Sequence, residues 1–190
     1  MNVLGWLLDE PPVERASGGP TADRSRGPAA AGALAAGGLL GAAAFHAVWV
    51  VSPWPLGSWA EFAELVVGVP EAELPSAPAT AAVAVLLSAA AWLVVTAARP
   101  GRRLAASRLV RWGAWTVTGI LALRGLGGLL APALALGTAP DGFRRWDLLL
   151  YSPLCTALAA LTAFVLLRTR PVGTPDGAGD EGPSGGSARA

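Results

Sequence analysis

Five polar or amphipathic side chains lie within long apolar segments or at their ends, where such side chains are uncommon. They are His46, Trp49, Arg124, Asp147 and Tyr151. A charged side chain in an apolar segment long enough to cross a membrane faces the inside of a bundle, because an arginine left in hydrocarbon costs about 2.5 to 3.5 kcal/mol. We therefore expect these five residues to form one polar cluster, held by hydrogen bonds and an ion pair.

Arg124 lies within the third apolar segment, so its guanidinium needs hydrogen-bond acceptors from neighbouring segments. The candidate partners are Asp147, Tyr151 and His46. Three interpretations of Arg124 stay open: a structural pair between two helices, a contact with an anion or a lipid headgroup, and a long side chain that reaches the membrane surface.

The other members of the cluster also have structural interpretations. Asp147 starts the fourth apolar segment, so its carboxylate either satisfies free amides in a first helical turn or pairs with Arg124. Tyr151 is four residues later on the same helix face. It either joins the polar cluster or is a tyrosine that lies at the membrane interface. His46 shares a face with Trp49 and is either a hydrogen-bonded structural residue or a proton-transfer group.

No catalytic, cofactor-binding or metal-ligating pattern accompanies these residues. The single Cys155 excludes a disulfide and a CxxC redox pair within one chain. One His and one Met leave no pair of haem ligands, and one His with scattered Glu lacks metal-ligand spacing. We expect no cofactor and no metal. An intramembrane enzyme that uses His46 and Asp147 is the alternative with the least support.

The segments that position these residues have the length of membrane spans. Of the 190 residues, 53% are hydrophobic and 14% are charged, whereas about 25% are charged in soluble domains. About 20 apolar residues cross a hydrocarbon core of about 30 Å. We therefore predict an all-α protein, a four-helix transmembrane bundle over residues 29–168. Its predicted spans are 29–51, 79–98, 112–136 and 147–167.

The arginines predict how the bundle is oriented. Near the span ends, ten lie on the side of the two tails, residues 1–28 and 169–190, while only Arg144 and Arg145 lie on the other side. Cytoplasmic loops carry such an excess of positive charge. Both tails are rich in Gly, Pro, Asp and Arg, so we expect them to be disordered and cytoplasmic. The use of Arg without Lys indicates a high-GC bacterial genome and hence a bacterial plasma membrane.

Two local patterns concern packing. Ser58 and Glu61 have capping-box spacing, which predicts a short interfacial helix over residues 59–67. In the first span Ala33, Gly37 and Gly41 recur at every fourth position, and such a stripe of small residues lets another helix approach closely.

Two stretches resemble a known family. FHAVWVVSPWPLG, at the end of the first span, and FRRWDLLLYSPLC, at the start of the fourth, are similar to motifs of small bacterial four-helix membrane proteins grouped as domain of unknown function 3995. The resemblance covers about residues 29–168 and implies the fold and the location, with no assigned activity. It singles out His46, Trp49, Arg124, Asp147, Tyr151 and Pro153.

These observations lead to a functional hypothesis. We expect a non-enzymatic, multi-pass membrane protein whose outward-facing polar cluster holds the bundle together and binds a partner or a lipid headgroup. The alternative is a transporter or a small-anion binding protein that uses Arg124 in an outward cavity. The expected partners are the lipid bilayer and a second copy or another membrane protein. A net charge of +1 gives no field to recruit nucleic acid.

Overall fold

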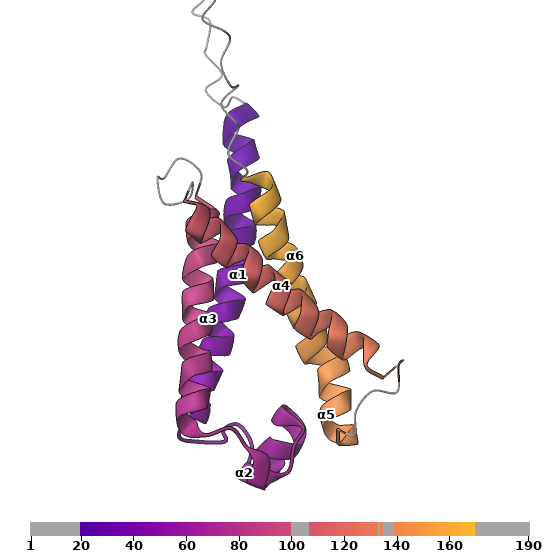
Figure 1. The fold of residues 1–190 in the computed structure, drawn as a ribbon. Coiled ribbons are helices and arrows are strands. Elements are labelled where there is room, and N and C mark those ends of the chain that lie inside the picture. Colours follow the sequence, from indigo (N-terminus) through magenta and orange to yellow (C-terminus); the bar gives the residue numbers. More distant parts are fainter. Residues whose placement is uncertain (1–19, 100–106, 133, 135–138, 170–190) are drawn as a thin grey trace, which may run out of the picture.

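The computed structural model describes residues 20–99, 107–132, 134 and 139–169, and these form helices and their connections (Figure 1). Four helices are long and apolar enough to cross a membrane, which confirms the all-α, four-span prediction. They are α1 (Pro20–Trp49), α3 (Ala77–Ala97), α4 (Arg108–Leu130) and a continuous run of α5 (Asp141–Trp146), η3 (Asp147–Tyr151) and α6 (Ser152–Arg168). Much of both predicted tails lies outside the described residues.

Some helix ends differ from the predicted span limits. The fourth helical run begins at Asp141, six residues before the predicted start at Asp147. Helix α4 ends at Leu130 rather than near residue 136, because Pro132 has no N–H with which to continue the helix. At the other end of the chain, α1 already begins at Pro20, since proline is favoured in a first helical turn.

The connection between α1 and α3 contains the predicted short helix. Helix α2 (Trp59–Phe62) continues into the π-helical η1 (Ala63–Val67), and the 3-10 turn η2 (Glu71–Glu73) follows. The Ser58 side chain accepts a hydrogen bond from Glu61 N at 3.2 Å. The Glu61 carboxylate accepts one from Gly57 N at 3.0 Å. Both bonds satisfy amides that the start of a helix leaves free.

The long helices pack as two pairs (Figure 1). Helix α1 lies along α3, α4 crosses α6, and α1 also contacts α6, which joins the pairs. The buried side chains at these contacts are mostly Ala, Val and Leu, and the small ones let the helix backbones approach closely. One apolar cluster consists of Ala31, Ala97, Ala98, Val110, Ala114, Val165 and Leu166. A second consists of Ala35, Ala36, Leu39, Ala90, Ala91, Val94 and Leu158.

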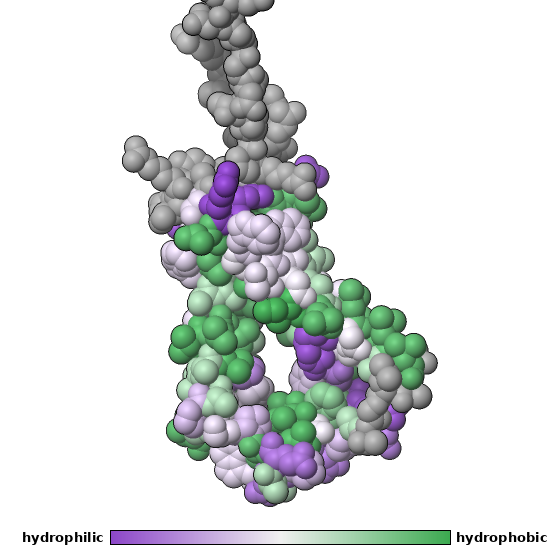
Figure 2. All heavy atoms as spheres, in the orientation of Figure 1, coloured by the Kyte–Doolittle hydropathy of each residue, from purple (hydrophilic) through white to green (hydrophobic). Residues whose placement is uncertain are grey.

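The two pairs diverge toward the end that carries α2 and α5 (Figure 1). There the connection after α1 bridges the pairs, because Gly68 lies against the Phe143 ring and Gly142 lies against Leu65. Figure 2 shows an opening between the pairs, closed off at this end by the bridge, with hydrophilic surface at its edge on the side of α4 and α6. The divergence therefore leaves the middle of the molecule accessible from outside.

The stripe predicted in the first span does not pack against any described part of the chain. Gly37 and Gly41 have no neighbouring atom within 4 Å of an added Cβ, and Ala33 is exposed. The packed face of α1 is instead the one that carries Ala35 and Leu39, both almost fully buried. This face is itself mostly alanine, with Leu39 as its large buried side chain, whereas Leu34 and Leu40 are exposed. Small residues therefore do let α1 approach its neighbours closely, but on a different face from the predicted stripe.

At the end of the bundle where α4 begins, Arg111 of α4 forms hydrogen bonds to the C-terminal end of α6. Its guanidinium donates to Leu166 O at 3.1 Å and to Thr169 O at 3.2 Å. These are carbonyls that a helix C-terminus leaves free, and they carry the negative end of the helix dipole. We expect Arg111→Leu to destabilise the protein by about 1 to 2 kcal/mol in detergent unfolding titrations.

Arg108 provides the control for that measurement. It lies one turn earlier on α4 and its side chain is exposed. Arg108→Leu removes the same charge from the same helix end and should change the unfolding free energy by much less. Equal losses for both variants would show that Arg111 acts through its charge alone and not through the two carbonyl contacts.

Candidate functional site

The third and fourth spans are joined by a polar cluster of Arg124, Asp147 and Ser152. Arg124 Nη2 donates to Asp147 Oδ1 at 2.6 Å, the distance of a charge-assisted hydrogen bond. Arg124 Nη1 donates to Ser152 Oγ at 3.3 Å. One guanidinium on α4 thereby bonds to both η3 and the start of α6.

A π-helical turn brings Asp147 and Ser152 to the same side of the fourth helical run. The turn η3 spans Asp147–Tyr151, and the amide of Ser152 bonds back to Asp147 O. In an α-helix, residues five apart point about 140° away from each other. The i to i+5 bonding of a π turn brings them nearly into line. Pro153 favours the wide turn, because its ring clashes with the carbonyl four residues earlier in a regular α-helix.

Two glycines on α4 let the fourth helical run come close enough for these bonds. A Cβ at Gly128 would overlap Ser152 Oγ and lie 2.8 Å from Arg124 Nη1. A Cβ at Gly125 would lie 2.7 Å from Thr156 N and 2.9 Å from Ser152 O, which are backbone atoms. The site therefore depends on the absence of a side chain at both positions.

The two charges of the site differ in accessibility. The Asp147 side chain is 10% exposed, whereas that of Arg124 is 43% exposed. Asp147 lies inside a continuous helical run, so the interpretation that it caps a first turn is wrong. Because α5 begins six residues earlier, the amides next to Asp147 are already bonded within the helix. Asp147 instead neutralises Arg124, and the pair carries no net charge.

Tyr151 lies beside this cluster without bonding to it. It is half-buried, and its ring lies 6.3 Å from that of Phe143. Among the described residues, Arg124 bonds to Asp147 and Ser152 and not to Tyr151. The π turn directs residue 152, rather than residue 151, toward α4.

His46 and Trp49 belong to a different site. His46 Nδ1 bonds to Ala42 O at 2.8 Å, and Trp49 Nε1 donates to Trp54 O at 2.9 Å. Both residues line a pocket of about 340 Å³ between the end of α1, the start of α3 and the connection that holds α2. The five residues expected in one cluster are thus divided between the α1–α3 pair and the α4–α6 pair.

The described residues include potential metal ligands and one cysteine. Over residues 20–99, 107–132, 134 and 139–169, no three His, Cys, Asp or Glu side chains gather in a way that could hold a metal ion. Cys155 is a free, half-buried thiol on α6. The chemistry that the Arg124 cluster can perform is hydrogen bonding and charge pairing between helices.

The comparisons with known proteins identify a family. Residues 39–162 match a family model described as "Protein of unknown function (DUF3995)". The matched region runs from the middle of α1 to the middle of α6, so it includes the Arg124 cluster and the His46 pocket. No curated protein and no solved structure matches the chain.

Proposed function

The chain belongs to the DUF3995 family, and from the geometry of its Arg124 cluster we propose that it is a membrane protein that binds the phosphate of a lipid headgroup. In this proposal Asp147 and Ser152 hold the Arg124 guanidinium in place between α4 and α6. The remaining donors of Arg124 receive the lipid phosphate. The observation that carries the proposal is a guanidinium that is fixed on one side and 43% exposed on the other.

The number of unused donors supports lipid binding. A guanidinium has five N–H groups, and Arg124 uses two of them within the described residues. The other three N–H groups require acceptors, since an unsatisfied donor in hydrocarbon costs several kcal/mol. Arginine binds phosphate through paired, parallel hydrogen bonds, and the bonds to Asp147 and Ser152 hold the planar fork of Arg124 in one position.

The depth of Arg124 in the span suits a headgroup. Six residues separate it from Leu130, the last residue of α4, which is roughly 9 Å at 1.5 Å per residue. A long arginine side chain can extend from that depth toward the interface. In the proposed orientation, with both chain ends in the cytoplasm of a bacterial cell, this is the outer leaflet. The phosphate groups of outer-leaflet lipids lie at the depth that the Arg124 guanidinium can reach.

The geometry gives less support to the other two hypotheses. A freely diffusing anion gains little attraction from a guanidinium that Asp147 already neutralises at 2.6 Å. A His46 and Asp147 enzyme needs both groups at a shared pocket. The described His46 pocket is lined by neither Asp147 nor Arg124. The bilayer itself holds a lipid phosphate near Arg124. Lipid binding therefore needs neither a long-range attraction by net charge nor a pocket shared by His46 and Asp147.

The proposal predicts a stabilisation that depends on the phosphate. In detergent, a phospholipid should raise the Tm of the protein, whereas a diacylglycerol with the same acyl chains should raise it much less. A ligand at a hundred times its Kd stabilises the folded state by about 2.7 kcal/mol. The charge-free double variant Arg124→Leu with Asp147→Asn should lose this difference between the two lipids.

Inorganic phosphate distinguishes the two possible sources of the anion. If inorganic phosphate alone raises the Tm as much as the phospholipid does, the small-anion hypothesis replaces lipid binding. The variant Arg108→Leu is the matched control, because it removes an arginine at the opposite end of the same helix. A phospholipid effect that disappears in Arg108→Leu and persists in the double variant would contradict the proposal.

A further inference from the structure

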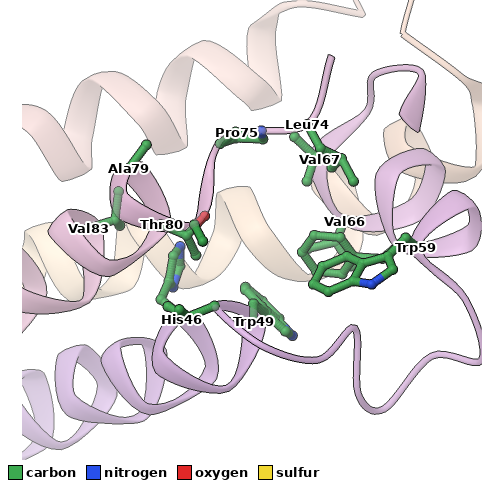
Figure 3. A pocket seen from close by; sticks show the side chains of 13 residues that line it. His46, Trp49, Trp59, Val66, Val67, Leu74, Pro75, Ala79, Thr80 and Val83 are labelled. Atoms are coloured by element: carbon green, nitrogen blue, oxygen red, sulfur yellow. The ribbon is translucent and has the colours of Figure 1, made fainter. Parts of the chain in front are cut away.

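The pocket beside His46 has the features of a small-molecule site. Its volume of about 340 Å³ lies within the range of ligand pockets, which are mostly apolar with a few polar groups that fix orientation. Figure 3 shows His46 and Thr80 at one end of the pocket and Trp59, Val66 and Val67 at the other. An apolar chamber with an imidazole and a hydroxyl group at one end fits a ligand that is apolar with one polar end.

The hydrogen bond of His46 fixes what its ring can offer such a ligand. Nδ1 lies 2.8 Å from Ala42 O, and a carbonyl oxygen only accepts hydrogen bonds. Nδ1 therefore carries the hydrogen, and in the neutral ring Nε2 is left as an acceptor. The Thr80 hydroxyl donates to Ser76 O at 3.3 Å, so its oxygen is also left to accept. The polar end of the pocket thus favours a ligand that donates.

The aromatic wall of the pocket, which runs from Trp49 beside His46 to Trp59 at the far end, favours an aromatic ligand. Phe62 lies between two tryptophans, with its ring 5.1 Å from that of Trp49 and 5.7 Å from that of Trp59. All three line the pocket. Aromatic rings gain from offset and edge-to-face contacts beyond the area that they bury. A planar ring in the pocket would add to this arrangement.

From these features we propose that the pocket binds a planar aromatic molecule with one hydroxyl group, a phenol, whose O–H donates to His46 Nε2. The aromatic wall of Trp49, Trp59 and Phe62 selects the ring. The acceptors at the polar end select the hydroxyl group. This site is separate from the Arg124 cluster and does not depend on lipid binding there.

A pair of probes of similar shape tests the proposal on the wild-type protein. 2-Naphthol and 2-methylnaphthalene have the same ring system, and only the first can donate. With the protein in nanodiscs, ligand-observed NMR against empty nanodiscs should give 2-naphthol an affinity about five times higher, as expected for one hydrogen bond. Equal affinities, or no binding of either probe, would overturn the proposal.

Variants locate the site. His46→Phe keeps a ring and removes the acceptor, so it should abolish the preference for 2-naphthol while both probes still bind. Val83→Trp fills the pocket and should abolish binding of both. Val85→Trp is its control, because Val85 lies on the same helix, is exposed and is not among the lining residues. If Val83→Trp and Val85→Trp bind the probes equally well, the pocket is not the site.

Discussion

Replacing Asp147 by asparagine should destabilise the protein by about 2 to 4 kcal/mol. The substitution keeps the size and the polarity of the side chain and removes the negative charge that lies 2.6 Å from Arg124. The guanidinium is then a cation without a counter-ion within an apolar span, which costs about 2.5 to 3.5 kcal/mol near the middle of a helix. Reversible unfolding in mixed micelles measures the loss.

Two further variants show whether the loss comes from the pair. Arg124→Leu should cost about as much as Asp147→Asn, whereas the charge-free double variant should cost less than either one, because it leaves neither charge without its partner. Asp141→Asn is the matched control, since Asp141 is fully exposed and lies 3.6 Å from Arg144. We expect no measurable change there. Additive losses at positions 124 and 147 would show that the two residues act independently.

The second large effect is expected from the glycines that bring α4 and α6 together. Gly125→Ala places a methyl group 2.7 Å from Thr156 N and 2.9 Å from Ser152 O. Because these are backbone atoms, the helices must move apart. Overpacking of this kind costs about 1 to 3 kcal/mol and occasionally more. Gly128→Ala should cost a similar amount and should also weaken the coupling between Arg124 and Asp147, since its methyl group takes the place of Ser152 Oγ.

Neighbouring glycines on the same helix provide the comparison. A Cβ at Gly119 or Gly127 meets no atom within 4 Å. Alanine favours a helix over glycine by about 1 kcal/mol. Gly119→Ala and Gly127→Ala should therefore leave the stability unchanged or raise it. If all four alanine variants have the same stability, the close approach of α4 to α6 is not a requirement of the fold.

The sequence was sufficient to predict the four apolar helices, because length and composition decide whether a segment can cross a membrane. It also led to the expectation that Arg124 and Asp147 would meet, since a charge within a span needs a partner. Both inferences rest on the cost of leaving a polar group in hydrocarbon. That cost is the same whatever the arrangement of the helices.

Other features depend on arrangement and were not predicted. Ser152 was not among the residues expected in the cluster, because α-helical spacing places Tyr151 rather than Ser152 on the face of Asp147. Pro153 was the available signal for the wide turn. Gly125 and Gly128 are three residues apart, and Gly128 is one turn beyond Arg124. This spacing is a signal in the sequence for a close approach of another helix beside Arg124. From the sequence, His46 was also expected to lie with Arg124. The structure separates them, because α1 packs with α3 and α4 packs with α6, and apolar composition does not predict which helices pack together.

The central claim is that the Arg124 guanidinium is held by Asp147 within the membrane-spanning part of the protein. Solid-state NMR of protein in lipid bilayers, with 15N in the arginine side chains and 13C at the aspartate carboxyl carbons, measures this contact directly. We predict strong dipolar dephasing between the two labels that is lost in Arg124→Leu and retained in Arg144→Leu. Dephasing that survives Arg124→Leu unchanged would contradict the account.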